Sequence, residues 1–193
     1  PSPMVEGTRA HERLAQRVLR GTPRSFAGPA GKLVELLVPD HARSERFDLV
    51  VHFHGAAWLA EQAVAGLDRR TVTAVLNLGT GSGIYDRSFS DPTAFDSLLA
   101  AVTREVSVVT GRAARVGRVT LVGFSAGHGA VRAILREPRH FAAVNAVLLL
   151  DGMHTSYAPE GTALAAGGAI DSTNLVAFTE FARAAMRGEQ RAD

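Results

Sequence analysis

The stretch that decides the fold reads Arg118-Val-Thr-Leu-Val-Gly-Phe-Ser-Ala-Gly-His-Gly-Ala-Val-Arg132. Residues 119–124 are mostly apolar and rich in β-branched side chains, which is typical of a buried strand. Beyond Ser125 the apolar residues recur with the period of a helix, at Ala126, Ala130, Val131, Ile134 and Leu135. The pattern therefore predicts a strand, a tight turn around Ser125, and then a helix.

The turn contains the pattern Gly-x-Ser-x-Gly, in the strand–turn–helix context that its chemistry requires. A serine on so sharp a turn adopts a strained backbone conformation, and glycines at 123 and 127 let the strand and the helix approach closely. This arrangement resembles the nucleophile elbow of serine hydrolases with the α/β-hydrolase fold, among them esterases and lipases. The resemblance implies that Ser125 is the nucleophile and that the N–H of Ala126 belongs to an oxyanion hole.

Strand and helix patterns alternate along the rest of the chain. Strands are predicted at residues 32–38, 47–53, 72–78, 119–124 and 144–150, and helices at 8–20, 57–65, 92–106, 126–135 and 175–186. The first two strands are joined by a polar connection of hairpin length, residues 79–90 read as a loop, and residues 153–174 read as a long flap. We expect a doubly wound, mostly parallel sheet of the α/β-hydrolase type with an antiparallel N-terminal hairpin, in one domain spanning 1–193.

A second loop at a strand end carries the residues His54-Gly55-Ala56. In esterases and lipases such a loop supplies the other N–H of the oxyanion hole. The resemblance implies that Ala56 or its neighbour Gly55 is this donor, and both stay candidates because the sequence continues Ala-Ala-Trp. His54, Trp58 and Tyr85 are expected to line the substrate pocket.

The acid and the base of a triad are sought after the last predicted strand. Asp151 follows that strand directly and is the candidate acid, and His154 is the only histidine beyond it. The resemblance implies a histidine on a loop after a later strand, and residues 151–193 predict no further strand. We therefore expect a C-terminally incomplete domain, whose base lies in a C-terminal fragment of the same protein, and a last helix beside an unpaired strand edge. His154 is the candidate base within the chain.

Composition excludes several classes of site and partner. The chain has no cysteine, so disulfides and thiolate metal sites are impossible. Its arginines are scattered among acids, which argues against a nucleic-acid surface, and no apolar run approaches the length of a membrane span. The expected ligand is a small carboxylic ester, with no metal or organic cofactor. Cysteine content does not indicate a compartment.

Two other functions remain open from the sequence. Residues 75–83 read Val-Leu-Asn-Leu-Gly-Thr-Gly-Ser-Gly, which resembles the glycine loop of S-adenosylmethionine-dependent methyltransferases. That reading requires an acidic residue at the end of the next strand, to bind a ribose. The other alternative is a binding or scaffold protein that keeps the hydrolase fold without catalysis.

Overall fold

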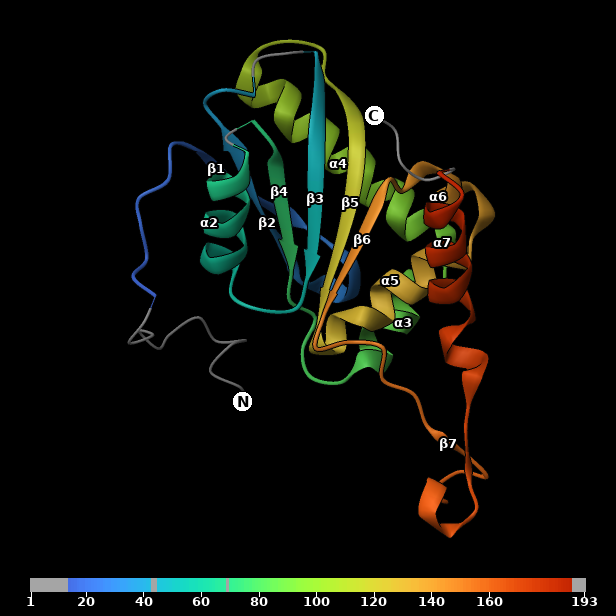
Figure 1. Cartoon of the computed structure of the whole chain (residues 1–193). Coiled ribbons are helices and arrows are strands. Elements are labelled where there is room, and N and C mark those ends of the chain that lie inside the picture. Colours follow the sequence, from blue (N-terminus) through green and yellow to red (C-terminus); the bar gives the residue numbers. More distant parts are fainter. Residues whose placement is uncertain (1–13, 43–44, 69, 189–193) are drawn as a thin grey trace.

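The computed structural model describes residues 14–42, 45–68 and 70–188, whose main feature is a six-stranded sheet in the order β1-β2-β4-β3-β5-β6 (Figure 1). The strands are β1 Gly21–Ala27, β2 Leu33–Pro39, β3 Arg46–Phe53, β4 Val72–Leu76, β5 Arg115–Phe124 and β6 Ala146–Leu150. Strand β2 is antiparallel to β1 and β4, and strands β4, β3, β5 and β6 are parallel to one another. The expected fold class, a mostly parallel sheet of the α/β-hydrolase type with antiparallel N-terminal strands, is confirmed.

Helices cover both faces of this sheet. The helices are α2 Ala57–Leu67, α3 Ser82–Phe89, α4 Pro92–Thr110, α5 His128–Leu135, α6 Pro138–Ala143 and α7 Val176–Met186. Alternate residues of the central strand β4 show the two layers. Val75 packs against α2, whereas Ala74 and Leu76 belong to the main core with buried side chains of α3, α4, α5 and α7. A strand apolar on both faces is what a doubly covered sheet requires.

The N-terminal hairpin exists, but the structure builds it from other strands than expected. Strand β2 does not pair with β3, because β4 lies between them and pairs with both. The partner of β2 is β1, which the sequence pattern did not predict. Gly21 and Pro23, which come directly after the helix expected at 8–20, belong to an outer strand, where a proline is tolerated because one side needs no ladder hydrogen bonds. The expected helix at 8–20 is wrong for residues 14–20, which are not helical; the rest of it lies outside the described residues.

Two further segments differ from expectation. Residues 82–89, expected as part of a loop, form helix α3. The expected flap at 153–174 is mostly irregular, but it contains a small antiparallel pair, β7 Tyr157–Ala158 and β8 Ala169–Ile170, separate from the main sheet.

Strand β6 ends the sheet within the described residues, since β5 is its only partner strand there. Its side chains alternate, and Leu148 and Leu150 are 49% and 41% exposed on one face. A groove of about 560 Å³ reaches Ala146 on that face, and an apolar groove of about 520 Å³ separates β6 from α7 on the other. The outer strand is thus bordered by open apolar surface on both faces.

Candidate active site

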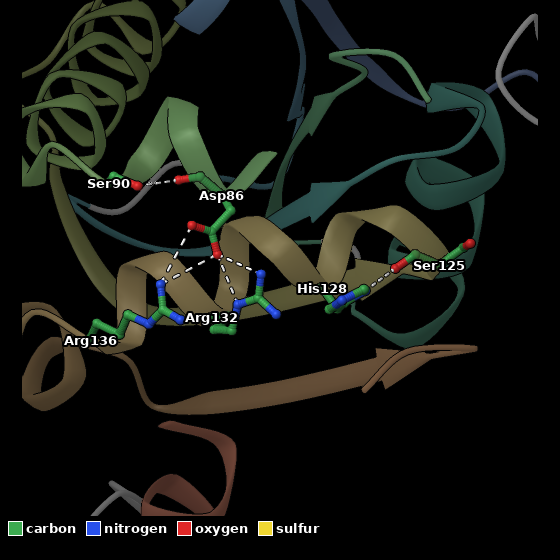
Figure 2. A network of polar contacts seen from close by, with 6 residues as sticks. All are labelled: Asp86, Ser90, Ser125, His128, Arg132 and Arg136. Atoms are coloured by element: carbon green, nitrogen blue, oxygen red, sulfur yellow. Dashed lines mark hydrogen bonds and ion pairs between the residues drawn. The ribbon is translucent and has the colours of Figure 1, made fainter. Parts of the chain in front are cut away.

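Ser125 occupies the turn between β5 and α5. Its φ is +43°, in the left-handed region that non-glycine residues rarely adopt. A single 3₁₀ turn, Ser125–Gly127, leads from the strand into the helix. The hydroxyl of Ser125 has no hydrogen-bond partner among the described residues, and Figure 2 shows it pointing away from the side chains of α5.

The two glycines of this turn are required by close packing. A Cβ on Gly123 would lie 3.0 Å from the backbone nitrogen of His128, and a Cβ on Gly127 would collide with the carbonyl oxygen of Phe53 at the end of β3. Gly123 thus lets β5 and α5 approach closely, as expected, whereas Gly127 brings the serine turn against the backbone of the neighbouring strand β3.

The backbone of the loop after β3 is held by four hydrogen bonds. The N–H of His54 donates to the carbonyl of Leu76, and the carbonyl of His54 accepts from Nε2 of His52 at 2.9 Å. Gly55 is clamped by one side chain: its N–H donates to Oδ1 of Asn77 at 2.7 Å, and its carbonyl accepts from Nδ2 of Asn77 at 2.5 Å. Three of these bonds fix the loop to the end of β4, and the one from His52 holds it to β3.

The clamp makes the two N–H groups of the loop different. The N–H of Gly55 is occupied by Asn77, so it is not available to a ligand in this conformation. The N–H groups of Ala56 and Ala126 have no hydrogen-bond partner within the described part of the chain. Ala56 directly precedes α2, and its carbonyl accepts from the N–H groups of Leu59 and Ala60 in the first turn of that helix. Ala126 lies in the serine turn.

The three residues expected to line the substrate pocket, Trp58, Tyr85 and His54, differ in burial and in their contacts. Trp58 is half-buried in the first turn of α2. Tyr85 is fully buried in the main core, and its hydroxyl contacts Nδ1 of His54 at 2.9 Å. The His54 ring lies between Tyr85 and a stacked neighbour, Phe124, which directly precedes the serine. Burial lowers the pKa of His54, so its ring is neutral near pH 7.

The structure does not assemble Ser125, Asp151 and His154 into a hydrogen-bonded triad. Asp151 is exposed, with φ +51°, and its carboxylate has no partner among the described residues. The ring of His154 donates from Nε2 to the backbone carbonyl of Asp151 at 2.8 Å and lies edge-on to His128, 5.5 Å between centroids. His128 in turn donates from Nδ1 to the carbonyl of Ser125 at 2.7 Å, not to its hydroxyl. Burial, above all, lowers the pKa of His128.

A buried ion pair, which the sequence did not predict, joins α3 to α5 near the serine turn (Figure 2). Asp86 of α3 receives two hydrogen bonds from Arg132 of α5, from Nε at 2.8 Å and from Nη2 at 2.7 Å, and both side chains are largely buried. Arg136 approaches the same carboxylate at 3.5 Å. Asn77 was missed as well. In each case the partner is more than 20 residues away in the sequence, so no local pattern pointed to it.

The described residues also bear on a metal site, a membrane-spanning helix and the ribose site of a methyltransferase. No group of three or more His, Asp or Glu side chains in the described ranges is arranged to hold a metal ion. No described helix has the length and apolar character needed to cross a bilayer. The strand that follows the glycine loop, β5, ends at Phe124 and Ser125 with no acidic residue, so the ribose-binding position of a methyltransferase is missing.

Comparison with known proteins gives no family assignment: no family model matches the chain, and no curated protein matches it. Among solved structures, an α/β hydrolase fold protein of unknown function is 15% identical, with TM-score 0.46 over 69% of this chain and 44% of that one. One of two fungal esterases from Rhizomucor miehei is 15% identical, with TM-score 0.42 over 70% and 45%. A siderophore hydrolase from Aspergillus nidulans, EstB, is 17% identical, with TM-score 0.39 over 72% and 60%.

The chain thus spans less than two thirds of the length of each of these structures. The strand order and directions of its own sheet are those of an α/β fold of the hydrolase type.

Proposed function

We propose that this chain is a serine hydrolase that acts on carboxylic esters by acyl transfer. In this mechanism Ser125 attacks the ester carbonyl and forms an acyl-enzyme, which water then hydrolyses. The N–H groups of Ala126 and Ala56 hold the oxyanion that develops on the carbonyl oxygen. The ester is a small molecule, and the chemistry asks for no metal or organic cofactor.

One observation carries the proposal: within the described residues, the strained Ser125 has a hydroxyl without a partner, and the N–H groups of Ala126 in its own turn and of Ala56 in the loop after β3 are unpaired. Strain at a non-glycine residue persists only where the surroundings enforce it, and it gathers at functional sites. Here the glycine contacts with Phe53 and His128 enforce it. Asn77 supports the same reading, since it removes Gly55 from the choice of donors and leaves Ala56.

The mechanism also needs a base that accepts the serine proton and an acid that orients this base. We assign the acid to Asp151 and the base to His154, whose Nδ1 keeps its lone pair because Nε2 donates to a carbonyl. Moving this ring onto the Ser125 hydroxyl requires a rearrangement of the loop after β6. The alternative, a non-catalytic binding protein on the same fold, is favoured by the absence of an imidazole bonded to Ser125 Oγ in the described residues.

Labelling with a fluorophosphonate probe, read by intact mass, separates these two functions. A single adduct on the native chain that is lost in Ser125→Ala supports the hydrolase, and loss of the adduct in His154→Ala as well supports the assigned base. A folded chain that takes up no label contradicts the hydrolase and favours the binding protein. His41→Ala, which changes an exposed histidine outside the site, is the matched control and should label normally.

A further inference from the structure

The contacts of the His54 ring, at the candidate site, indicate which of its two nitrogens carries the proton. Its residue is only 6% exposed, and Nδ1 lies 2.9 Å from the hydroxyl of Tyr85. Nε2 has no hydrogen-bond partner within the described residues. Which nitrogen carries the proton decides whether this ring donates a hydrogen bond to a ligand or accepts a proton from one.

The surroundings of Tyr85 settle the direction of the bond. The Tyr85 oxygen accepts from the N–H of Leu78 at 3.1 Å, and the Tyr85 side chain is fully buried. A phenolic oxygen has two acceptor sites and one proton. A buried O–H needs an acceptor, and among the described residues Nδ1 of His54 is the one acceptor within hydrogen-bond distance of the Tyr85 hydroxyl, so the Tyr85 O–H donates to Nδ1. Nδ1 is then the unprotonated nitrogen, and the proton of the neutral ring is on Nε2.

Two contacts place this ring beside the serine turn. It stacks on Phe124, with centroids 5.9 Å apart and planes inclined by 16°. Phe124 is bonded directly to Ser125, and Ala56 lies two residues after His54. The two ring nitrogens point in divergent directions, so Nε2 is directed away from Tyr85 and the buried face of α3.

We propose that Tyr85 is a positioning residue that holds His54 as an Nε2–H donor, and that this N–H binds an oxygen of the ester beside the two backbone amides. The inference rests on the proposed function and extends it. In this state His54 cannot be the base, because neither of its nitrogens can take the serine proton: one accepts from Tyr85 and the other is already protonated.

The first test reads the proton directly and does not depend on catalysis. Nitrogen-15 NMR of the histidine rings distinguishes the two neutral tautomers. We expect the Nε2–H form for His54 near neutral pH, and a mixture of tautomers in Tyr85→Phe. Tyr157→Phe, which removes the other tyrosine hydroxyl of the chain at an exposed site, should leave His54 unchanged. A proton on Nδ1, a charged ring, or an unaltered tautomer in Tyr85→Phe would each overturn the proposal.

The second test reads the donor. His54→Leu removes both the acceptor of the Tyr85 bond and the Nε2–H donor, whereas His54→Gln offers an N–H near the position of Nε2. We expect fluorophosphonate labelling of Ser125 to slow by about tenfold or more in the leucine variant and to recover in the glutamine variant. Equal rates in the two variants, with both folded by circular dichroism, would overturn the donor role alone. No labelling of the native chain would overturn the proposed function together with the donor role, while the NMR result on the tautomer would stand.

Discussion

Residue by residue, the candidate site depends on positions where a larger side chain has no room. Gly127 is the sharpest case, because its Cα faces the carbonyl oxygen of Phe53 across the contact between α5 and β3. Neither backbone can move aside cheaply: β3 is hydrogen-bonded on both edges, to β4 and β5. The strained φ of Ser125 is maintained by this lack of space.

Gly127→Ala should therefore destabilise the fold by about 3 kcal/mol or more, the upper range for overpacking. Gly66→Ala is the matched control, since Gly66 lies in α2 with nothing within 4 Å of an added Cβ. Alanine there should raise stability by up to about 1 kcal/mol, through helix propensity. Urea denaturation measures both. Equal effects of the two substitutions would contradict the packing argument.

The sequence predicts those residues of the site whose role depends only on their neighbours in the chain. Ser125, Gly123 and Gly127 follow from a five-residue pattern within one turn. The choice of Ala56 over Gly55 could not be made, because it depends on Asn77, 22 residues away. The expectation that Tyr85 lines a pocket faced the same difficulty: only the fold shows that its hydroxyl lies under His54. The roles of Asp151 and His154 stay predictions.

Among the elements, α3 is a helix that its sequence does not predict and that tertiary contacts stabilise. It is eight residues long, follows a run of glycines, and is too short to be stable alone. Its stability comes from α5: Gly129 admits the carbonyl of Ser82 at close range, and Asp86 pairs with Arg132. The helix that presents Tyr85 to His54 is thus fixed by the helix that follows the serine.

Removing one member of this ion pair should cost more than removing both. Asp86→Leu leaves Arg132 buried without a partner, and we expect a loss of about 3 kcal/mol in the free energy of unfolding. The double variant Asp86→Leu, Arg132→Met should recover most of that loss, because apolar side chains of similar size need no counter-charge. Chemical denaturation of the single and double variants checks this. A double variant as unstable as the single one would contradict it.

Helix α4 is the element whose start the sequence predicted well. Asp91 caps it, accepting from the N–H of Thr93 at 2.9 Å and from the Thr93 hydroxyl at 2.7 Å, with Pro92 in the first turn. The Thr93 side-chain hydrogen bond, followed by the backbone one, lowers the pKa of Asp91 below its usual 3.8. A carboxylate with a lowered pKa stabilises the folded state above its unfolded pKa, and this contribution is lost as the pH falls through the folded pKa.

Asp91→Ala should accordingly lower the melting temperature near neutral pH, and its difference from the native chain should shrink as the pH falls below 3.8. Asp91→Asn keeps an uncharged cap acceptor and should show no pH dependence arising from this position. Thermal unfolding followed by circular dichroism over this pH range gives both curves. A difference for Asp91→Ala that is constant with pH would contradict the charged cap.

For the whole molecule, the parallel core could be predicted and the pairing of its outer strands could not. The apolar runs at 72–78 and 119–124 predict strands covered on both faces, and such strands belong in the middle of a sheet. Nothing local indicates that β4 comes between β2 and β3, or that β1 completes the sheet at one side. At the other side, the described residues leave β6 with one partner and with exposed leucines.

An outer strand of this kind favours association between chains. We expect the 193-residue chain to associate increasingly with concentration, and the double variant Leu148→Lys, Leu150→Lys to reduce this association. Val108→Lys, at an exposed position of α4, should have no such effect. Sedimentation velocity at several concentrations measures it. A native chain that stays monomeric throughout would contradict the expectation.

The contact between Gly127 and Phe53 also has a consequence for local opening. Because the serine turn rests on the last residue of β3, it cannot separate from the sheet unless the start of α5 and the end of β3 part together. Amide hydrogens on these two segments should then exchange with solvent through one shared opening event, with similar free energies, although they are more than 70 residues apart in the chain. The backbone around Ser125 would therefore be as slow to exchange as the middle of the sheet, unlike an ordinary surface turn.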